Sequence, residues 1–351
     1  MHVIDSFGPG GAQDIVYSVC KYGKNAANSV VILADSGTQW RRLTPYARVT
    51  ILSRTKYNGP LILVRLFSTV IRNRRAVING HLQASSLLLS LIRLVIRFNL
   101  ILTIHAIPSQ LPRWYNVLYS LFCRQAEYYV AEGMIVYRNL LRNKIAPHKV
   151  RYIGIGTEAV LNMKGPEVNI RDEFYIAKNT IVLLNIARMI KPKGQRDLLF
   201  VVKDLITAGF HMKYHLVIVG YGPEEKNLRR LARRFEIDEN VTFAGKRTDL
   251  HNFYSCADWF LMPCYDESMG VVIYESLAYG VPVIAYDSGD ITEVIDKETK
   301  GFIVPRGYKN VRDVVTKNNP PPKVTLSNDD RYKYSAQRMA LEYQELYGSM
   351  Q

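Results

Sequence analysis

The densest group of residues with the types and spacing for chemistry runs from Asp266 to Ile284. Two carboxylates lie in it: Glu267 in a loop after an apolar strand, and Glu275 about two turns into the next helix. The free backbone N–H groups at the start of that helix would come from Ser268, Met269, Gly270 and Val271. Such N–H groups bind phosphate, and a carboxylate can hold the vicinal hydroxyls of a ribose. The segment predicts a nucleotide site; the alternative is a solvated acidic turn followed by a surface glutamate.

Two basic residues follow the first apolar strand of the second half of the chain. Arg188 lies just past the end of that strand, and Lys193 comes directly before Gly194 and the next helix. Two fixed cations at the edge of a sheet suit a diphosphate, whose negative charge rises as it departs. Gly220 ends the following strand and could leave room for a base or a ribose. For each segment the alternative is a loop without a ligand.

A glycine-rich turn, Gly8-Pro9-Gly10-Gly11, joins the first predicted strand to the first predicted helix. Glycines let the backbone approach a ligand, and the N–H groups of a helix start favour an anion. The turn also fits an NAD-dependent oxidoreductase in which Gly8, Gly10 and Asp35 contact the dinucleotide. That fingerprint is incomplete because Gln13 stands where its third glycine belongs.

The remaining histidines and cysteines indicate no metal or disulfide site. His105 ends a predicted strand, where a lone histidine is either structural or directed at a ligand. The cysteines are scattered without C-x-x-C spacing, which favours reduced thiols in a cytosolic compartment. We expect neither a signal peptide at the N-terminus nor a membrane-spanning helix.

The elements that position these residues alternate along the whole chain. This alternation predicts an α/β protein with right-handed βαβ units and a parallel sheet in each half. The predicted strands are 2–6, 29–34, 49–53, 76–79, 100–105, 127–131, 180–186, 214–219, 241–244, 258–262, 282–286 and 301–304. The predicted helices are 12–23, 60–74, 84–97, 111–124, 133–144, 194–208, 223–236, 248–255, 269–279, 290–296 and 309–317. Ligands of open α/β sheets bind at the carboxyl ends of strands, where the residues above lie.

The domain organisation follows from two breaks in this alternation. The first break contains Gly165-Pro166. The second is a proline-rich stretch, 316–328, which comes before a last helix, 329–347. We predict a basic N-terminal domain, 1–165, a second domain, 166–328, and a C-terminal helical segment, 329–351.

Together these residues resemble the retaining glycosyltransferases of the GT-B fold, in the large family-four group (glycosyl transferases group 1). The matching residues are Gly10-Gly11, Arg188, Lys193-Gly194, Gly220, Glu267 through Glu275, and Gly280-Val281-Pro282-Val283-Ile284. The resemblance covers the whole chain. It implies two Rossmann-like domains facing a central cleft, with the C-terminal helix crossing back to the N-terminal domain. Ser268 and Ser288-Gly289-Asp290 depart from the family's pattern and bear on contacts with the donor sugar.

The resemblance also implies an activity: transfer of a hexose-type sugar from a UDP- or GDP-linked donor to a hydroxyl, with retention. Arg188 and Lys193 would stabilise the departing diphosphate, so no metal or other cofactor is expected. Glu275 would hold the ribose, Glu267 would contact the donor sugar, and His105 would donate to its hydroxyls. The N-terminal domain would bring the acceptor, with Gly10-Gly11 at the reacting face, where they would contact the donor. A nucleotide-sugar epimerase on the same fold is the alternative.

The charge of the chain indicates a further partner. Residues 1–165 hold 21 Lys+Arg and 6 Asp+Glu, whereas 166–351 hold 25 of each, so the first half carries the whole net charge of +15. Segments 60–75 and 84–97 mix apolar residues with arginines, as core helices or as a surface for anionic lipid. We expect a cytoplasmic protein, peripheral on the inner face of a bacterial plasma membrane, with a lipid-linked glycan as acceptor. A non-catalytic module for polyanions is an alternative; no nucleic-acid-binding signature is present.

Overall fold

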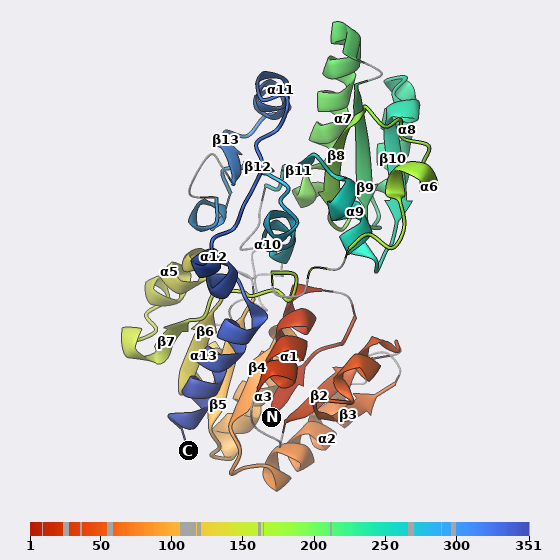
Figure 1. The fold of residues 1–351 in the computed structure, drawn as a ribbon. Coiled ribbons are helices and arrows are strands. Elements are labelled where there is room, and N and C mark those ends of the chain that lie inside the picture. The colour runs from red at the N-terminus through yellow and green to blue at the C-terminus, as the bar shows by residue number, and fades with distance from the viewer. Residues whose placement is uncertain are drawn as a thin grey trace. The chain divides into compact units, whose positions relative to one another are not determined.

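The computed structural model describes residues 1–8, 10–23, 28–35, 37–54, 59–105, 117, 121–160, 163, 165–210, 213–265, 270–288, 290–295 and 300–350. The chain forms two compact units (Figure 1). Met1–Gly156 and Lys333–Gln351 make up the N-terminal unit, and Thr157–Tyr332 the C-terminal unit. The boundaries predicted at 165 and 328 therefore shift to 156 and 332. One reason is that the Arg331 guanidinium donates to the Val160 carbonyl (3.2 Å), which ties both segments to the C-terminal unit.

A parallel seven-stranded sheet, in the order β3-β2-β1-β4-β5-β6-β7, is the centre of the N-terminal unit. Its strands are β1 His2–Ile4, β2 Ser29–Ala34, β3 Arg48–Ser53, β4 Ile78–His81, β5 Leu100–Ile104, β6 Tyr128–Ala131 and β7 Val150–Tyr152. Parallel strands are buried on both faces, and all five residues of β5 are buried. The chain reverses its direction of winding between β1 and β4, so the carboxyl ends of these two neighbours form a switch point.

Helices cover both faces of this sheet. They are α1 Gly11–Tyr22, α2 Gly59–Arg72, α3 Gln83–Val95, α5 Met134–Arg142 and α13 Ala336–Gly348. Apolar residues of α2, α3 and α5 share one core with β4 and β5, whereas α1 packs in a second core with Ile4, Val30 and Ile32. Helix α13 packs against α1, so the last residues of the chain complete the N-terminal unit.

The C-terminal unit is built around a parallel six-stranded sheet in the order β10-β9-β8-β11-β12-β13. Its strands are β8 Ile181–Ile186, β9 Tyr214–Val219, β10 Val241–Gly245, β11 Trp259–Met262, β12 Val283–Tyr286 and β13 Gly301–Val304. Its helices are α6 Ile170–Glu173, α7 Gln195–Leu205, α8 Glu225–Arg234, α9 Leu250–Cys256, α10 Val271–Ala278, α11 Tyr308–Lys317 and α12 Asn328–Lys333, which ends just past the boundary. The switch point of this sheet lies between β8 and β11.

The predicted α/β architecture with two parallel sheets is confirmed, with local differences. The short elements β7 and α6 were not predicted. Only a 3-10 turn, Ile291–Glu293, is described within the predicted helix 290–296. The predicted helix 329–347 is broken into α12 and α13 because Ser335 is extended and its hydroxyl caps α13, accepting from Arg338 N (3.1 Å). The predicted helix 111–124 lies mostly outside the described residues.

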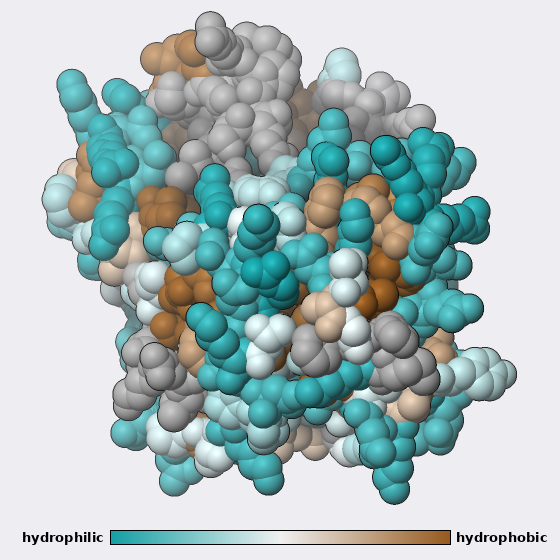
Figure 2. Space-filling view, turned by 90° about the horizontal axis from the view of Figure 1, so that it is seen from above, coloured by the Kyte–Doolittle hydropathy of each residue, from teal (hydrophilic) through white to brown (hydrophobic). Residues whose placement is uncertain are grey.

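The surface carries both polar and apolar side chains. Hydrophilic side chains cover most of the face in Figure 2, with hydrophobic patches between them. Among the helices that the structure describes, none is long and apolar enough to cross a membrane. All four cysteines are free thiols.

Candidate functional site

Glycines bring three strand-end loops of the C-terminal unit together at the switch point. A Cβ on Gly220 would lie 2.0 Å from the Ala187 carbonyl oxygen, and one on Gly194 would lie 1.9 Å from that of Pro263. Both glycines also have positive φ, +140° and +68°. Only glycine permits these approaches without a shift of the backbone. The loops after β8, β9 and β11 therefore form one packed rim.

Hydrogen bonds fix this rim. Met189 N donates to the Tyr221 carbonyl (3.0 Å), which joins the loops after β8 and β9. Tyr265 N donates to the Pro192 carbonyl (2.8 Å), which joins the loops after β8 and β11. The Gln195 side chain donates to the Arg188 carbonyl (3.0 Å) and so holds the backbone of the predicted diphosphate loop.

The two predicted cations lie on this rim. Arg188 is exposed, and in the part of the chain that the structure describes no carboxylate pairs with its guanidinium. Lys193 is half-buried in the 3-10 helix Lys191–Lys193. Gly220 lies against the Ala187-Arg188 backbone, so the structure places Gly220 beside Arg188. A planar guanidinium without a protein carboxylate can bind a phosphate through two parallel hydrogen bonds.

Helix α10 begins on the same rim, because it follows β11. Gly270 is its N-cap and is buried against the Met262 side chain, and Val271 is its first residue. In the middle of the helix, Glu275 Oε2 accepts a hydrogen bond from the Tyr254 hydroxyl (2.8 Å). This hydrogen bond orients the Glu275 carboxylate. Glu267, Ser268 and Met269 lie outside the described residues.

Tyr254, which contacts the predicted site residue Glu275, was not singled out from the sequence. It lies on α9, is buried, and stacks on Tyr279 with ring centroids 5.5 Å apart. Burial raises the pKa of Tyr254 well above its ordinary value, with a further contribution from Glu275. The hydroxyl therefore stays protonated and donates at neutral pH.

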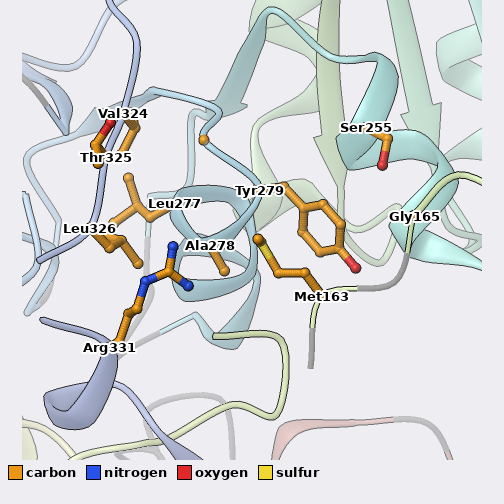
Figure 3. Close-up of a pocket in the computed structure, with 11 residues that line it drawn as sticks. Met163, Gly165, Ser255, Leu277, Ala278, Tyr279, Val324, Thr325, Leu326 and Arg331 are labelled. Atoms are coloured by element: carbon orange, nitrogen blue, oxygen red, sulfur yellow. The ribbon is translucent and has the colours of Figure 1, made fainter. Parts of the chain in front are cut away.

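The cavity in Figure 3 is a separate feature of the C-terminal unit. It has a volume of about 580 Å³ and lies at the C-terminal end of α10. Its described lining includes Leu277–Gly280, Val324–Leu326 and Arg331, and the figure shows the Arg331 guanidinium directed toward α10. None of the predicted site residues is among the described residues that line it.

Ionisable side chains end four neighbouring strands of the N-terminal unit. Asp5 follows β1, His81 ends β4, His105 follows β5 and Glu132 follows β6. His105 Nδ1 lies 2.8 Å from Glu132 Oε2, and His105 Nε2 lies 3.2 Å from His81 Nδ1. His81 Nε2 in turn lies 3.0 Å from Nδ1 of His2. His105, singled out from the sequence, is therefore one member of a buried side-chain array.

The glycine-rich turn lies at the same switch point, next to Asp5. Gly10 is the N-cap of α1 and Gly11 its first residue. Asp5 accepts from Ala84 N (3.1 Å) and Ser85 N (2.6 Å) at the start of α3. Burial raises the pKa of Asp5, and these hydrogen bonds oppose the rise. The turn and the histidine array thus share one edge of the N-terminal sheet.

Asp35, which would contact the dinucleotide in an NAD-dependent oxidoreductase, accepts two hydrogen bonds from the protein's own backbone. Its Oδ2 accepts from Phe7 N (3.0 Å) and its Oδ1 from Gly37 N (2.7 Å). The Gln13 side chain is buried and donates to the Ser6 carbonyl (3.1 Å). Asp35 and Gln13 therefore brace the glycine-rich turn, which disfavours the NAD interpretation.

No metal site is evident: the described ranges contain no cluster of three or more His, Cys, Asp or Glu residues arranged to hold an ion. Sequence reasoning missed His2, His81 and Glu132. His81 and Glu132 carried one available signal, a polar residue at the end of an apolar strand, as for His105.

This chain is similar to several known proteins. Residues 167–318 match the family described as glycosyl transferases group 1. The O-antigen biosynthesis glycosyltransferase WclY of Escherichia coli is 27% identical over 210 residues, 58% of this chain and 56% of WclY. The GDP-mannose-dependent alpha-(1-6)-phosphatidylinositol monomannoside mannosyltransferase of Mycobacterium tuberculosis is 30% identical over 172 residues, 46% and 44% of the two chains. The chain thus spans about half the length of these curated relatives.

Solved structures extend the likeness to the whole chain. HepE of Anabaena, solved with UDP and glucose, has a TM-score of 0.84 at 18% identity. The similarity covers 99% of this chain and 100% of HepE, and it shows a common fold. The chain has the GT-B fold, and its residues 167–318 match the glycosyl transferases group 1 family.

Proposed function

We propose that this protein transfers a hexose-type sugar from a nucleotide sugar to a hydroxyl group, with retention of anomeric configuration. One observation carries the proposal. Within the region that matches the family, the switch point between β8 and β11 brings together Arg188, Lys193, Gly220 and the start of α10. This set combines cations and free N–H groups, as a diphosphate requires.

Each residue has a distinct part in this proposal. Arg188 and Lys193 bind the diphosphate, together with the N–H groups at the start of α10. Glu275, oriented by Tyr254, accepts hydrogen bonds from the ribose hydroxyls. Glu267 is assigned to the donor sugar on the family resemblance alone, and Ser268 and Met269 to the diphosphate on the same ground.

The reaction follows from where charge develops. The bond between the anomeric carbon and the diphosphate oxygen breaks through an oxocarbenium-like transition state. The acceptor oxygen forms its bond on the same face of the sugar, and its proton passes to the departing phosphate oxygen. Arg188 and Lys193 stabilise the negative charge that grows on that diphosphate. These cations supply the stabilisation, so the proposed mechanism needs no metal.

The N-terminal unit supplies the acceptor side of the proposal, with Gly10-Gly11 and His105 at one edge of its sheet. We assign it a glycan acceptor, lipid-linked in surface-polysaccharide synthesis. The names of two relatives, one acting in O-antigen biosynthesis and one on a phosphatidylinositol mannoside, support this class of acceptor.

An anionic membrane is the proposed docking surface of the N-terminal unit, at the cytoplasmic face. Helix α2 exposes Leu61, Val64 and Ile71 to solvent, with exposed fractions of 45%, 65% and 44%. Exposed Arg72, Arg74 and Arg75 follow within four residues at its C-terminal end. Apolar side chains beside arginines suit the boundary between lipid tails and anionic headgroups.

Thermal unfolding with UDP-, GDP-, ADP- and TDP-sugars tests the donor site. We expect one of them to raise Tm, because a ligand at a hundredfold excess over Kd stabilises the native state by about 2.7 kcal/mol. Arg188→Ala should abolish most of this rise, whereas Lys191→Ala, an exposed neighbour outside the proposed site, should retain it. Stabilisation by no nucleotide sugar, or by NADH instead, would overturn the proposal.

A further inference from the structure

We propose that Glu132, His81 and His2 are positioning residues that hold His105 in a single tautomer, and that a proton added to His105 shifts the protons of His81 and His2 between their ring nitrogens at the same time. The role in catalysis rests on the proposed function. The tautomer itself does not, and it can be measured without any substrate.

The geometry is a continuous chain of hydrogen bonds through the sheet. It runs from Glu132 through His105 and His81 to His2, with successive distances of 2.8, 3.2 and 3.0 Å. The side chains of His105 and Glu132 are 11% and 5% exposed, and His2 and His81 are buried. Water therefore has little access to the ring nitrogens, and each ring must find its partners in the protein.

Glu132 gives the chain a direction, because an ionised carboxylate only accepts hydrogen bonds. His105 must therefore donate from Nδ1, which leaves its Nε2 as an acceptor. His81 must then donate from Nδ1 to that Nε2, and the same reasoning makes His2 donate from Nδ1 to His81. All three neutral rings are thus fixed as Nδ1–H tautomers.

The same series of hydrogen bonds determines how a proton can be added. A proton placed on His105 Nε2 would face the Nδ1–H of His81. The two N–H groups avoid this clash only if the His81 proton moves from Nδ1 to Nε2 and the His2 proton moves in the same way. The three rings then hold four N–H protons instead of three, and the charge lies on His105 opposite Glu132. Burial lowers the pKa of His2 to about 3 and that of His81 well below its ordinary value, so neither inner ring holds the charge.

Titratable groups on neighbouring segments face the array and belong to the same electrostatic environment. They are the Met1 amino group before β1, Asp5 after β1, and Tyr343 and Tyr347 on α13. Burial raises the pKa of both tyrosines, so they remain neutral. Tyr347 accepts from the Asn79 amide (2.9 Å) and Tyr343 lies 3.4 Å from the Thr103 hydroxyl, so α13 covers the array from one side.

This arrangement changes what His105 can do for a bound sugar. The resemblance gives His105 the role of donor to a sugar hydroxyl, but its Nδ1–H donates to Glu132 and its Nε2 accepts from His81. The His105 ring gains an Nε2 proton only when the hydrogen bonds between the three rings reverse their direction. His81 and Glu132 therefore control His105 as a donor, although neither needs to touch the sugar.

The tautomers can be read from the imidazole ¹⁵N chemical shifts of the full-length protein, assigned with single His→Gln variants. At neutral pH we expect His2, His81 and His105 all to carry their proton on Nδ1. On acidification, the nitrogens of all three rings should change in one step. An Nε2–H tautomer at His105, or a His105 transition that leaves His81 unchanged, would overturn the proposal.

Two variants separate positioning from folding. Glu132→Gln places a group that donates as well as accepts beside Nδ1, so we expect both tautomers of His105. His81→Phe removes the ring that joins His105 to His2, so acidification should no longer change the His2 nitrogens together with those of His105. The control, His215→Gln, removes a histidine of the C-terminal unit bonded to Thr242 and should leave the three rings unaltered.

The catalytic part has its own readout. Glu132→Gln and His81→Phe should each lower kcat about tenfold or more with the donor KM unchanged, the size of effect known for the hydrogen-bond partners of metal-bound histidines. If no nucleotide sugar raises the Tm of the wild type, that result would instead count against the proposed function. Normal kcat in a variant with altered His105 tautomers would overturn the positioning role alone.

Discussion

At the residue scale, the structure separates side chains available to a ligand from those that orient them. Arg188 presents an exposed guanidinium, whereas Glu275 is held by a buried tyrosine. The sequence revealed Arg188 and Glu275 because each has a recognisable place relative to a strand or helix. It did not reveal Tyr254, because its contact with Glu275 crosses 21 residues and depends on how α9 packs beside α10.

Tyr254→Phe should show what this orientation contributes. The variant removes a buried hydrogen bond to a carboxylate, so we expect the free energy of unfolding to fall by about 1.5–3 kcal/mol. Chemical denaturation at neutral pH measures this loss. Tyr175→Phe is the matched control, because Tyr175 is 95% exposed and should tolerate the change. Equal stability of the two variants would contradict an orienting role for Tyr254.

At the element scale, most strands and helices were predictable because buried parallel strands are short apolar runs separated by amphipathic helices. The exceptions have physical causes. β7 has only three residues, two of them exposed, so no apolar run marks it. The break at Ser335 interrupts a helical pattern because the residue meets Gly156, whose Cβ would lie 2.2 Å from the Ser335 carbonyl oxygen. Such contacts join distant segments, and no local pattern reports them.

Gly220→Ala should disrupt the rim of the C-terminal sheet. The substitution forces an unfavourable φ and places a methyl group against the Ala187 carbonyl. Backbone strain alone costs about 1–3 kcal/mol, so we expect the free energy of unfolding to fall by more than this cost. Gly245 also has a positive φ, +69°, but open space around its Cβ, so Gly245→Ala should cost less. Denaturant unfolding of both variants makes the comparison, and an equal loss would contradict the close approach.

At the scale of the whole molecule, charge and topology divide the chain in the same way. The N-terminal unit has 22 Lys+Arg against 7 Asp+Glu, and the C-terminal unit has 24 of each. The charge asymmetry was visible in the sequence, but the return of the last residues to the N-terminal unit was not. Lys333–Gln351 returns to the first unit through contacts such as Tyr343 with Thr103, across 240 residues.

Removing three arginines tests the proposed membrane surface. The triple variant Arg72→Ala/Arg74→Ala/Arg75→Ala should weaken binding to anionic vesicles by about 3 kcal/mol, at roughly 1 kcal/mol per basic residue. Vesicle flotation at increasing salt measures this. The control, Arg230→Ala/Arg233→Ala/Arg234→Ala, removes equal charge from exposed positions on α8 of the neutral unit. Binding that is independent of anionic lipid, or equally weakened by the control, would refute the assignment.

The return of α13 to the N-terminal unit also sets an order of assembly during synthesis. Residues 157–332 leave the ribosome before α13 does, so the second unit can fold while the first still lacks a helix. Until Tyr347 and Tyr343 arrive, Asn79 and Thr103 on the first sheet lack their partners from α13. The N-terminal unit is therefore synthesised first but completes its fold only after the C-terminal unit has been made.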